Sequence, residues 1–196
     1  PKNQVDADVF CHALIKAGHT TTADLSMADC IIVNTCGFIE SAKAEAIENI
    51  LEACAYKQQN PELKVIVTGC LAERYRSQIE EEIPEVDAVV GCASNKAIDT
   101  IVARLFHGEN HLESYGAKKD FPLGGKRVIG TPAHYAYLKI AEGCNNRCHY
   151  CAIPGIRGPL HSRDLADCVA EARWLAGEGV KELIVVAQDP TAYGED

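Results

Sequence analysis

Apolar and polar residues alternate along the chain in blocks that predict repeated pairs of a buried strand and an amphipathic helix. Residues 30–35 form a continuous apolar, β-branched run, which is typical of a strand covered on both faces. Ile47, Ile50, Leu51 and Cys54, by contrast, recur on one face of a helix. The predicted strands cover residues 30–35, 64–68, 86–90, 137–141 and 183–187, and the predicted helices cover residues 5–17, 40–58, 71–82, 95–107 and 164–177.

The order of these elements predicts an α/β protein with two domains. Strand and helix alternate three times within residues 1–108, which indicates a three-layer domain around a parallel sheet. Residues 109–134 are polar, rich in Gly and Pro and without a clear period, so they are predicted to link the domains. Residues 135–196 begin a further β-loop-α-β unit that has too few strands to bury both faces. We therefore expect this unit to be the truncated start of a second domain.

Composition places the chain in a reducing compartment and gives it an acidic surface. The 10 cysteines among 196 residues are too few for a disulfide scaffold, and no hydrophobic leader precedes them, so they are interpreted as thiols, metal ligands or redox groups. No apolar run is long enough to cross a membrane. The net charge of −9 argues against binding nucleic acid by charge alone. It suits a basic partner or simply gives solubility.

The strongest chemical signal is a cysteine-rich loop after the predicted strand 137–141. Cys144, Cys148 and Cys151 follow the spacing C-x3-C-x2-C. Three soft thiolates select iron–sulfur clusters, zinc or copper(I). A structural zinc site would need a fourth ligand, for which His149 is badly placed, whereas an iron–sulfur cluster with three protein ligands keeps one iron open for a small molecule.

These cysteines, with Tyr150 directly before the last of them, resemble the signature of the radical S-adenosylmethionine (SAM) family. Within that family the chain is similar to the methylthiotransferases, and among these to the type that modifies a ribosomal protein. The segments that carry this resemblance lie along nearly the whole chain, at residues 1–6, 34–36, 69–70, 138–144, 153–154, 157–158, 162–163 and 188–194.

The resemblance implies a fold, an activity and a set of cofactors. It implies a methylthiotransferase N-terminal domain over residues 1–108 and, from residue 135, the first part of a radical SAM partial TIM-type (β/α) barrel. The implied reaction adds a methylthio group to the β-carbon of an aspartate in protein twelve of the small ribosomal subunit. It requires two 4Fe-4S clusters, SAM and an electron donor such as flavodoxin or ferredoxin. The implied enzyme is cytoplasmic.

The resemblance also assigns roles to individual residues. Cys144, Cys148 and Cys151 would hold the cluster that binds SAM. Cys36 and Cys70, each at the end of a predicted strand, would hold an auxiliary cluster whose third ligand directly precedes Pro1 in the family. The residues expected to contact SAM are Tyr150, Ile153, Arg157, Ser162 and Gln188. No side chain is assigned as catalytic.

Several alternatives remain open at this stage. Cys92 ends the third predicted strand as Cys70 ends the second, so it could approach the auxiliary cluster. Cys11, Cys30, Cys54 and Cys168 fit core packing. Within the enzyme class, the second candidate is the methylthiotransferase that modifies a tRNA adenosine. Outside it, a non-catalytic iron–sulfur or zinc protein would carry the same cysteines.

Overall fold

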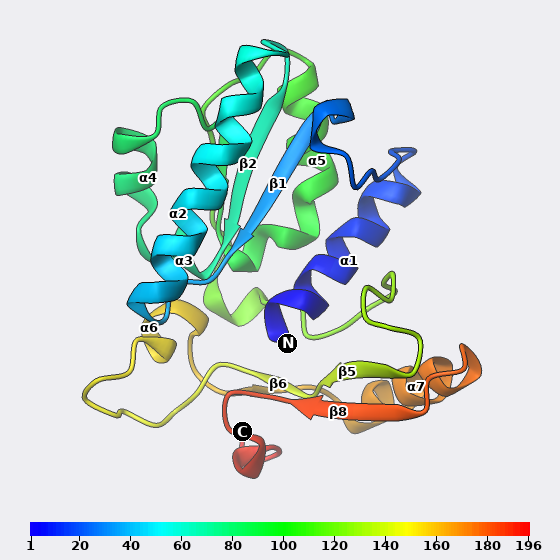
Figure 1. The fold of residues 1–196 in the computed structure, drawn as a ribbon. Helices are drawn as coiled ribbons and strands as arrows, with labels where there is room; N and C mark the ends of the chain where they lie inside the picture. Colours follow the sequence, from blue (N-terminus) through cyan, green and yellow to red (C-terminus); the bar gives the residue numbers. More distant parts are fainter.

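A computed structural model describes residues 1–196, and a four-stranded parallel sheet forms its larger unit (Figure 1). The strands are β1 (Cys30–Thr35), β2 (Lys64–Gly69), β3 (Ala88–Val90) and β4 (Leu112–Ser114), in that spatial order. Thr35 is opposite Gly69 and Thr68 is opposite Val90, so the first three strands end at one common edge. The residues that directly follow these strands are therefore neighbours.

Helices cover both faces of the sheet and give it three layers (Figure 1). They are α1 (Lys2–Lys16), α2 (Glu40–Ala55), α3 (Cys70–Arg74), α4 (Arg76–Glu82) and α5 (Ile98–Phe106). Successive side chains of β2 alternate between two cores: Val65 and Val67 pack with α2 and α4, and Ile66 packs with α1 and α5. Both faces of β2 are thus buried, as its unbroken apolar sequence predicts.

A smaller unit follows. Here β5 (Tyr135–Lys139) pairs in parallel with β8 (Glu182–Val186), and Leu175 of α7 (Leu165–Gly177) packs against β5. In the chain between β5 and α7, β6 (Ala141–Glu142) pairs antiparallel with β7 (His161–Ser162). The segment that connects β6 to β7 contains the short helix α6 (Ile153–Arg157). Short 3-10 turns complete the structure at Leu25–Met27, Tyr56–Gln58, Cys92–Ala97, Lys118–Asp120 and Pro190–Ala192.

The α/β class and the parallel sheet are confirmed, and the main differences from prediction concern two helices and the linker. The helix predicted over 71–82 is broken at Tyr75, whose backbone leaves the helical region (φ −122°, ψ 33°). The helix predicted over 95–107 begins as the 3-10 turn Cys92–Ala97 before α5. The stretch predicted as a linker contributes β4, the fourth strand of the sheet. The sheet unit therefore extends past residue 108.

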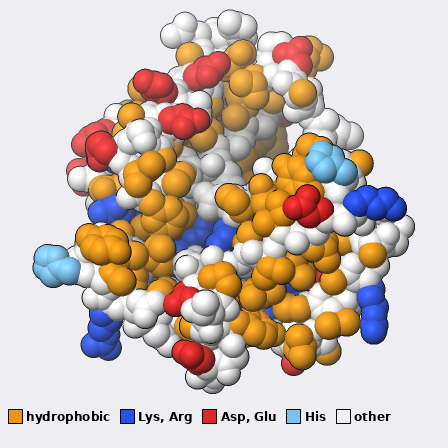
Figure 2. Space-filling model, turned by 60° about the horizontal axis from the view of Figure 1, so that its bottom comes forward, with side chains coloured by type: hydrophobic (Ala, Val, Ile, Leu, Met, Phe, Trp, Pro, Cys, Tyr) orange, Lys and Arg blue, Asp and Glu red, His pale blue; other side chains and the backbone are white.

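Figure 2 brings forward the side of the molecule formed by the smaller unit, and hydrophobic side chains gather over much of this face. β8 contributes Leu183 and Val185, which are 37% and 50% exposed. β8 pairs with β5 alone, so its outer edge has no neighbouring strand. None of the helices is long and apolar enough to span a lipid bilayer.

Gly69 is the glycine at the sheet edge that combines a positive φ with a close backbone approach, and its replacement gives a testable prediction. Its φ is +96°, and a Cβ there would lie 2.3 Å from the Thr35 carbonyl oxygen. We expect Gly69→Ala to reduce the free energy of unfolding by at least about 3 kcal/mol, because backbone strain and a steric clash add. Urea unfolding measures this loss.

The matched control is Gly108→Ala. Gly108 has a similar φ of +92°, but a Cβ there meets no atom within 4 Å. The Gly108→Ala variant therefore measures only the free-energy cost of placing alanine in the left-handed backbone region, about 1–2 kcal/mol. Equal losses in the two variants would show that the close approach at Gly69 does not constrain the sheet edge.

Candidate metal centre

Cys144, Cys148 and Cys151 lie in the loop that connects β6 to α6. The base of this loop is fixed by backbone contacts: the Cys144 amide donates to the Gly158 carbonyl at 3.1 Å. A Cβ on Gly143 would lie 1.8 Å from the Pro159 carbonyl oxygen, so the chain passes closer here than any other residue permits. Further along, the Cys151 amide donates to the Cys148 carbonyl at 3.0 Å. The loop is therefore anchored at its start and turned back at its tip.

The donor set of this loop suits an iron–sulfur cluster. Cys148 is exposed and the other two thiols are half-buried. No three Cys, His, Asp or Glu side chains in the structure lie together as a ready-made metal site. The loop has no helix or strand between Gly143 and Ala152, and its three soft thiols are the type of donor that iron–sulfur clusters take. Three ligands leave one coordination position open.

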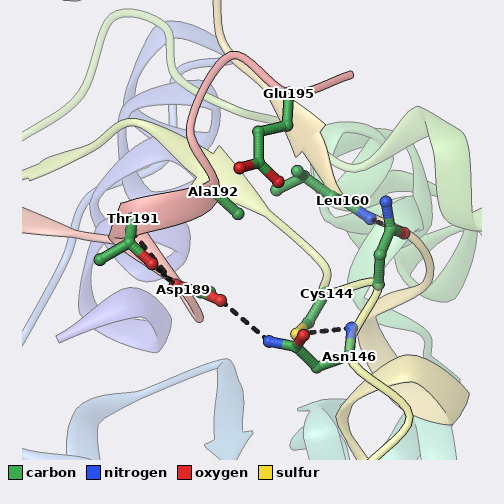
Figure 3. A pocket seen from close by; sticks show the side chains of 8 residues that line it. Cys144, Asn146, Leu160, Asp189, Thr191, Ala192 and Glu195 are labelled. Atoms are coloured by element: carbon green, nitrogen blue, oxygen red, sulfur yellow. Dashed lines mark hydrogen bonds between the residues drawn. The ribbon is translucent and has the colours of Figure 1, made fainter.

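A small cavity of about 130 Å³ borders Cys144 (Figure 3). The Asn146 amide donates to the Asp189 carboxylate at 2.9 Å, which joins the cysteine loop to the segment after β8. Hydrogen bonds from Thr191 and Asn146 lower the pKa of Asp189. The remaining lining residues are Asn145, Leu160, Thr191, Ala192 and Glu195. The cavity is thus polar and offers several hydrogen-bonding groups beside Cys144.

A second group of cysteines lies at the edge of the larger sheet. Cys36 and Cys70 directly follow β1 and β2, and Cys92 comes two residues after the end of β3, so the parallel topology brings all three to one edge. Cys70 and Cys92 are fully buried and pack with Phe121 and Ile156, whereas Cys36 is half-buried. Ile156 belongs to α6, so this edge faces the helix that follows the cysteine loop.

Between the two groups of cysteines lies a network of buried charges. Asp6 of α1 accepts hydrogen bonds from Lys139 at 2.6 Å and from Arg157 at 2.9 Å. Glu142 lies 3.4 Å from the Lys139 ammonium, 3.2 Å from the Arg157 guanidinium and 2.7 Å from the Lys2 ammonium. Burial alone would raise the pKa of Glu142, but these cations outweigh it and hold the pKa at about 2. The network joins the sheet unit to the smaller unit.

Arg157 connects this network to a cysteine of the sheet edge. Its Nη2 donates to the Cys70 sulfur at 3.1 Å and to the Asn3 side chain at 2.6 Å. The Cys92 thiol and the Arg157 guanidinium together outweigh burial and lower the pKa of Cys70 to about 7. Arg157 Nε is buried and has no hydrogen-bond partner. An orphaned donor beside a thiol fits a site that takes a further group with acceptor atoms, such as a cluster with inorganic sulfides.

The five residues expected to contact SAM have different surroundings. Tyr150 is 91% exposed, and Ile153 begins α6. Ser162 lines a wider hollow of about 550 Å³ and accepts a hydrogen bond from the Gly194 amide. Gln188 donates to Glu142 at 2.6 Å and accepts from Lys2. Arg157 is buried against Cys70, a position that the sequence analysis did not predict.

Sequence reasoning missed the polar residues that line the cavity at Cys144. Asn146 and Asp189 are 43 residues apart and meet only because β5 and β8 are adjacent. Asp189 lies within the segment 188–194 that carries the family resemblance, so a signal was present there. No pattern in the sequence distinguished Asn146 from an ordinary loop residue.

The burial of the other cysteines predicts how the thiols react in iron-free protein. Burial raises the pKa of Cys30 to about 12 and of Cys54 to about 11. At pH 8 their thiolate fractions are then about one in ten thousand and one in a thousand. We expect iodoacetamide to label the exposed Cys148 at least about a hundredfold faster than Cys30. Peptide mass spectrometry over a labelling time course measures the rates, and equal rates would contradict the burial of Cys30.

Comparison with known protein families assigns both parts of the chain. Residues 1–91 match a family described as uncharacterized protein family UPF0004, and residues 138–196 match the radical SAM superfamily. Cys36 and Cys70 fall in the first match, and the three cysteines of the loop fall in the second. Cys36 and Cys70 thus belong to one recognised segment and the loop cysteines to another, whereas Cys92 lies just outside the first match.

Individual relatives resemble the whole chain. It is 49% identical to the ribosomal protein uS12 methylthiotransferase RimO of Acetivibrio thermocellus, and it covers 45% of that protein. It is 46% identical to the protein of the same name in Clostridioides difficile and 45% identical to that of Caldicellulosiruptor saccharolyticus, covering 44% of each. The chain therefore spans less than half the length of these curated relatives.

Proposed function

The chain belongs to the radical SAM methylthiotransferase family, and we propose that its protein adds a methylthio group to an aspartate of ribosomal protein uS12. The observation that carries this proposal is the identity of 43–49% with proteins of that printed name across all of the chain. The proposed site of addition is the aspartate β-carbon. We further propose that residues 135–196 start a radical SAM barrel.

Two sets of cysteines hold the cofactors in this proposal. Cys144, Cys148 and Cys151 hold one 4Fe-4S cluster, and their exposed loop leaves room for SAM at the open iron. Cys36 and Cys70 provide two ligands of an auxiliary cluster at the sheet edge. The clusters and SAM, when bound, supply the electron transfer, the hydrogen abstraction and the sulfur chemistry of methylthiolation.

The remaining residues of the chain position these ligands and the substrate. Tyr150, Ile153, Ser162 and Gln188 are proposed to surround SAM. Asn146 and Asp189 hold the start of the cysteine loop against the segment after β8. The Asp6–Lys139 ion pair fixes the sheet unit against β5, so that both groups of cysteines keep one relative placement.

The proposed partners agree with the charge of the chain. Its net charge of −9 favours a basic protein such as one from the ribosome, and it disfavours direct binding of RNA by charge. An electron donor such as flavodoxin or ferredoxin would reduce the clusters. A ribosomal substrate implies that the enzyme works in the cytoplasm.

The decisive experiment incubates the intact, anaerobically reconstituted protein with SAM and a reductant, using ribosomes in one reaction and unmodified tRNA in another. Mass spectrometry of uS12 peptides should show a methylthio group in place of one hydrogen on a single aspartate. Modification of a tRNA adenosine instead would assign the protein to the tRNA branch. A protein that binds zinc, or a cluster that does not respond to SAM, would exclude a radical SAM enzyme.

A further inference from the structure

Arg157 has an unusual position for an arginine. It is 1% exposed and lies at the end of α6, six residues after Cys151. Its Nη1 contacts the carboxylates of Asp6 and Glu142. Its Nη2 reaches across to the sheet edge, where it donates to the Cys70 sulfur at 3.1 Å. One side chain therefore touches both the charge network and a proposed cluster ligand.

The guanidinium keeps one donor unused. Arg157 Nε is fully buried and makes no hydrogen bond. Because Nε and Nη2 lie along one edge of the rigid, planar group, this free N–H adjoins the donors that contact Asn3 and Cys70. A buried N–H without a partner costs roughly 1–3 kcal/mol, so its retention favours an acceptor that occupies this place in the loaded protein.

We propose that Arg157 is a positioning residue that donates hydrogen bonds to the sulfur atoms of the auxiliary cluster and thereby raises its reduction potential. This inference rests on the proposed function, which places an iron–sulfur cluster at Cys70. Reduction adds negative charge to a cluster, and a nearby cation with N–H donors stabilises the more negative state. The acceptors are the Cys70 thiolate at Nη2 and a cluster sulfide at Nε.

The test uses the intact protein with Cys144, Cys148 and Cys151 all replaced by alanine, so that only the auxiliary cluster remains. Redox titration followed by electron paramagnetic resonance then compares this parent with Arg157→Gln and Arg157→Lys. We expect Arg157→Gln to lower the ratio of reduced to oxidised cluster at a fixed potential at least about tenfold, or about 59 mV for one electron. Arg157→Lys keeps the positive charge but loses the planar set of guanidinium N–H donors, so its reduction potential should shift less than that of Arg157→Gln.

Arg127→Gln is the matched control. Arg127 is also a buried arginine between the two units, with Asp8 and Glu171 each at 2.9 Å, and no cysteine is among its partners. The Arg127→Gln substitution should disturb packing between the two units without changing the reduction potential of the cluster. A shift in Arg127→Gln as large as that in Arg157→Gln would reduce Arg157 to a structural role.

The remaining outcomes separate this inference from the proposed function. If the parent binds a cluster and Arg157→Gln titrates like the parent, the inference is wrong and the proposed function stands. If Arg157→Gln fails to fold or to hold the cluster, Arg157→Lys decides, since an unchanged potential there overturns the inference. If the parent binds no cluster at all, the two-cluster assignment itself is wrong.

Discussion

Alanine in place of Cys144, Cys148 or Cys151 is expected to reduce SAM cleavage to the background rate and to remove one cluster's share of iron. In the proposed function each loop cysteine supplies one of the three protein ligands of the cluster that binds SAM. The loss should be nearly complete for each single variant, because the loop contains no fourth cysteine. Iron analysis and chromatographic measurement of 5′-deoxyadenosine test both effects.

Cys168→Ala is the control for this experiment. Cys168 is buried on α7, outside both groups of ligand cysteines, and fits core packing. Its loss should lower stability slightly and leave iron content and SAM cleavage unchanged. Full SAM cleavage in the Cys148→Ala variant, or loss of iron in Cys168→Ala, would overturn the assignment of the loop.

The larger sheet was predictable because its central strands β2 and β3 are apolar and bury both faces. The apolar, β-branched run 30–35 also has the bounds of β1, although this edge strand is only partly buried. β4 was missed because it is only three residues long and includes Glu113, which is exposed. Such a strand forms only because β3 provides a partner, and a single sequence does not reveal that partner.

The positions of the cysteines in the fold were predictable, but the contacts around them were not. The three loop cysteines lie close together in the sequence. The ends of β1 and β2 place Cys36 and Cys70 at one edge of the sheet. The network around Asp6 is different, because its partner Lys139 is 133 residues away. In the sequence both look like ordinary surface charges, and their burial becomes visible only when α1 packs against β5.

Asp6→Ala is expected to produce the largest loss of stability of any single substitution in the network. The carboxylate binds Lys139 at 2.6 Å and Arg157 at 2.9 Å, and all three side chains are at most 4% exposed. Its removal leaves two buried cations with only the more distant Glu142 as an acid. Breaking a buried pair in this way costs about 3–5 kcal/mol. The melting temperature should therefore fall by roughly 6–20 °C.

Calorimetry on proteins with equal cluster content measures this loss, since bound cofactor also raises the melting temperature. Glu40→Ala is the surface control, because Glu40 is 88% exposed and lies 3.7 Å from Lys43, so its pair contributes at most about 0.5 kcal/mol. Asp6 lies in the sheet unit and Lys139 in the smaller unit, so the Asp6→Ala variant should also begin to unfold in two steps. A single transition at the parent temperature would show that the apolar contacts, and not this ion pair, hold the two units together.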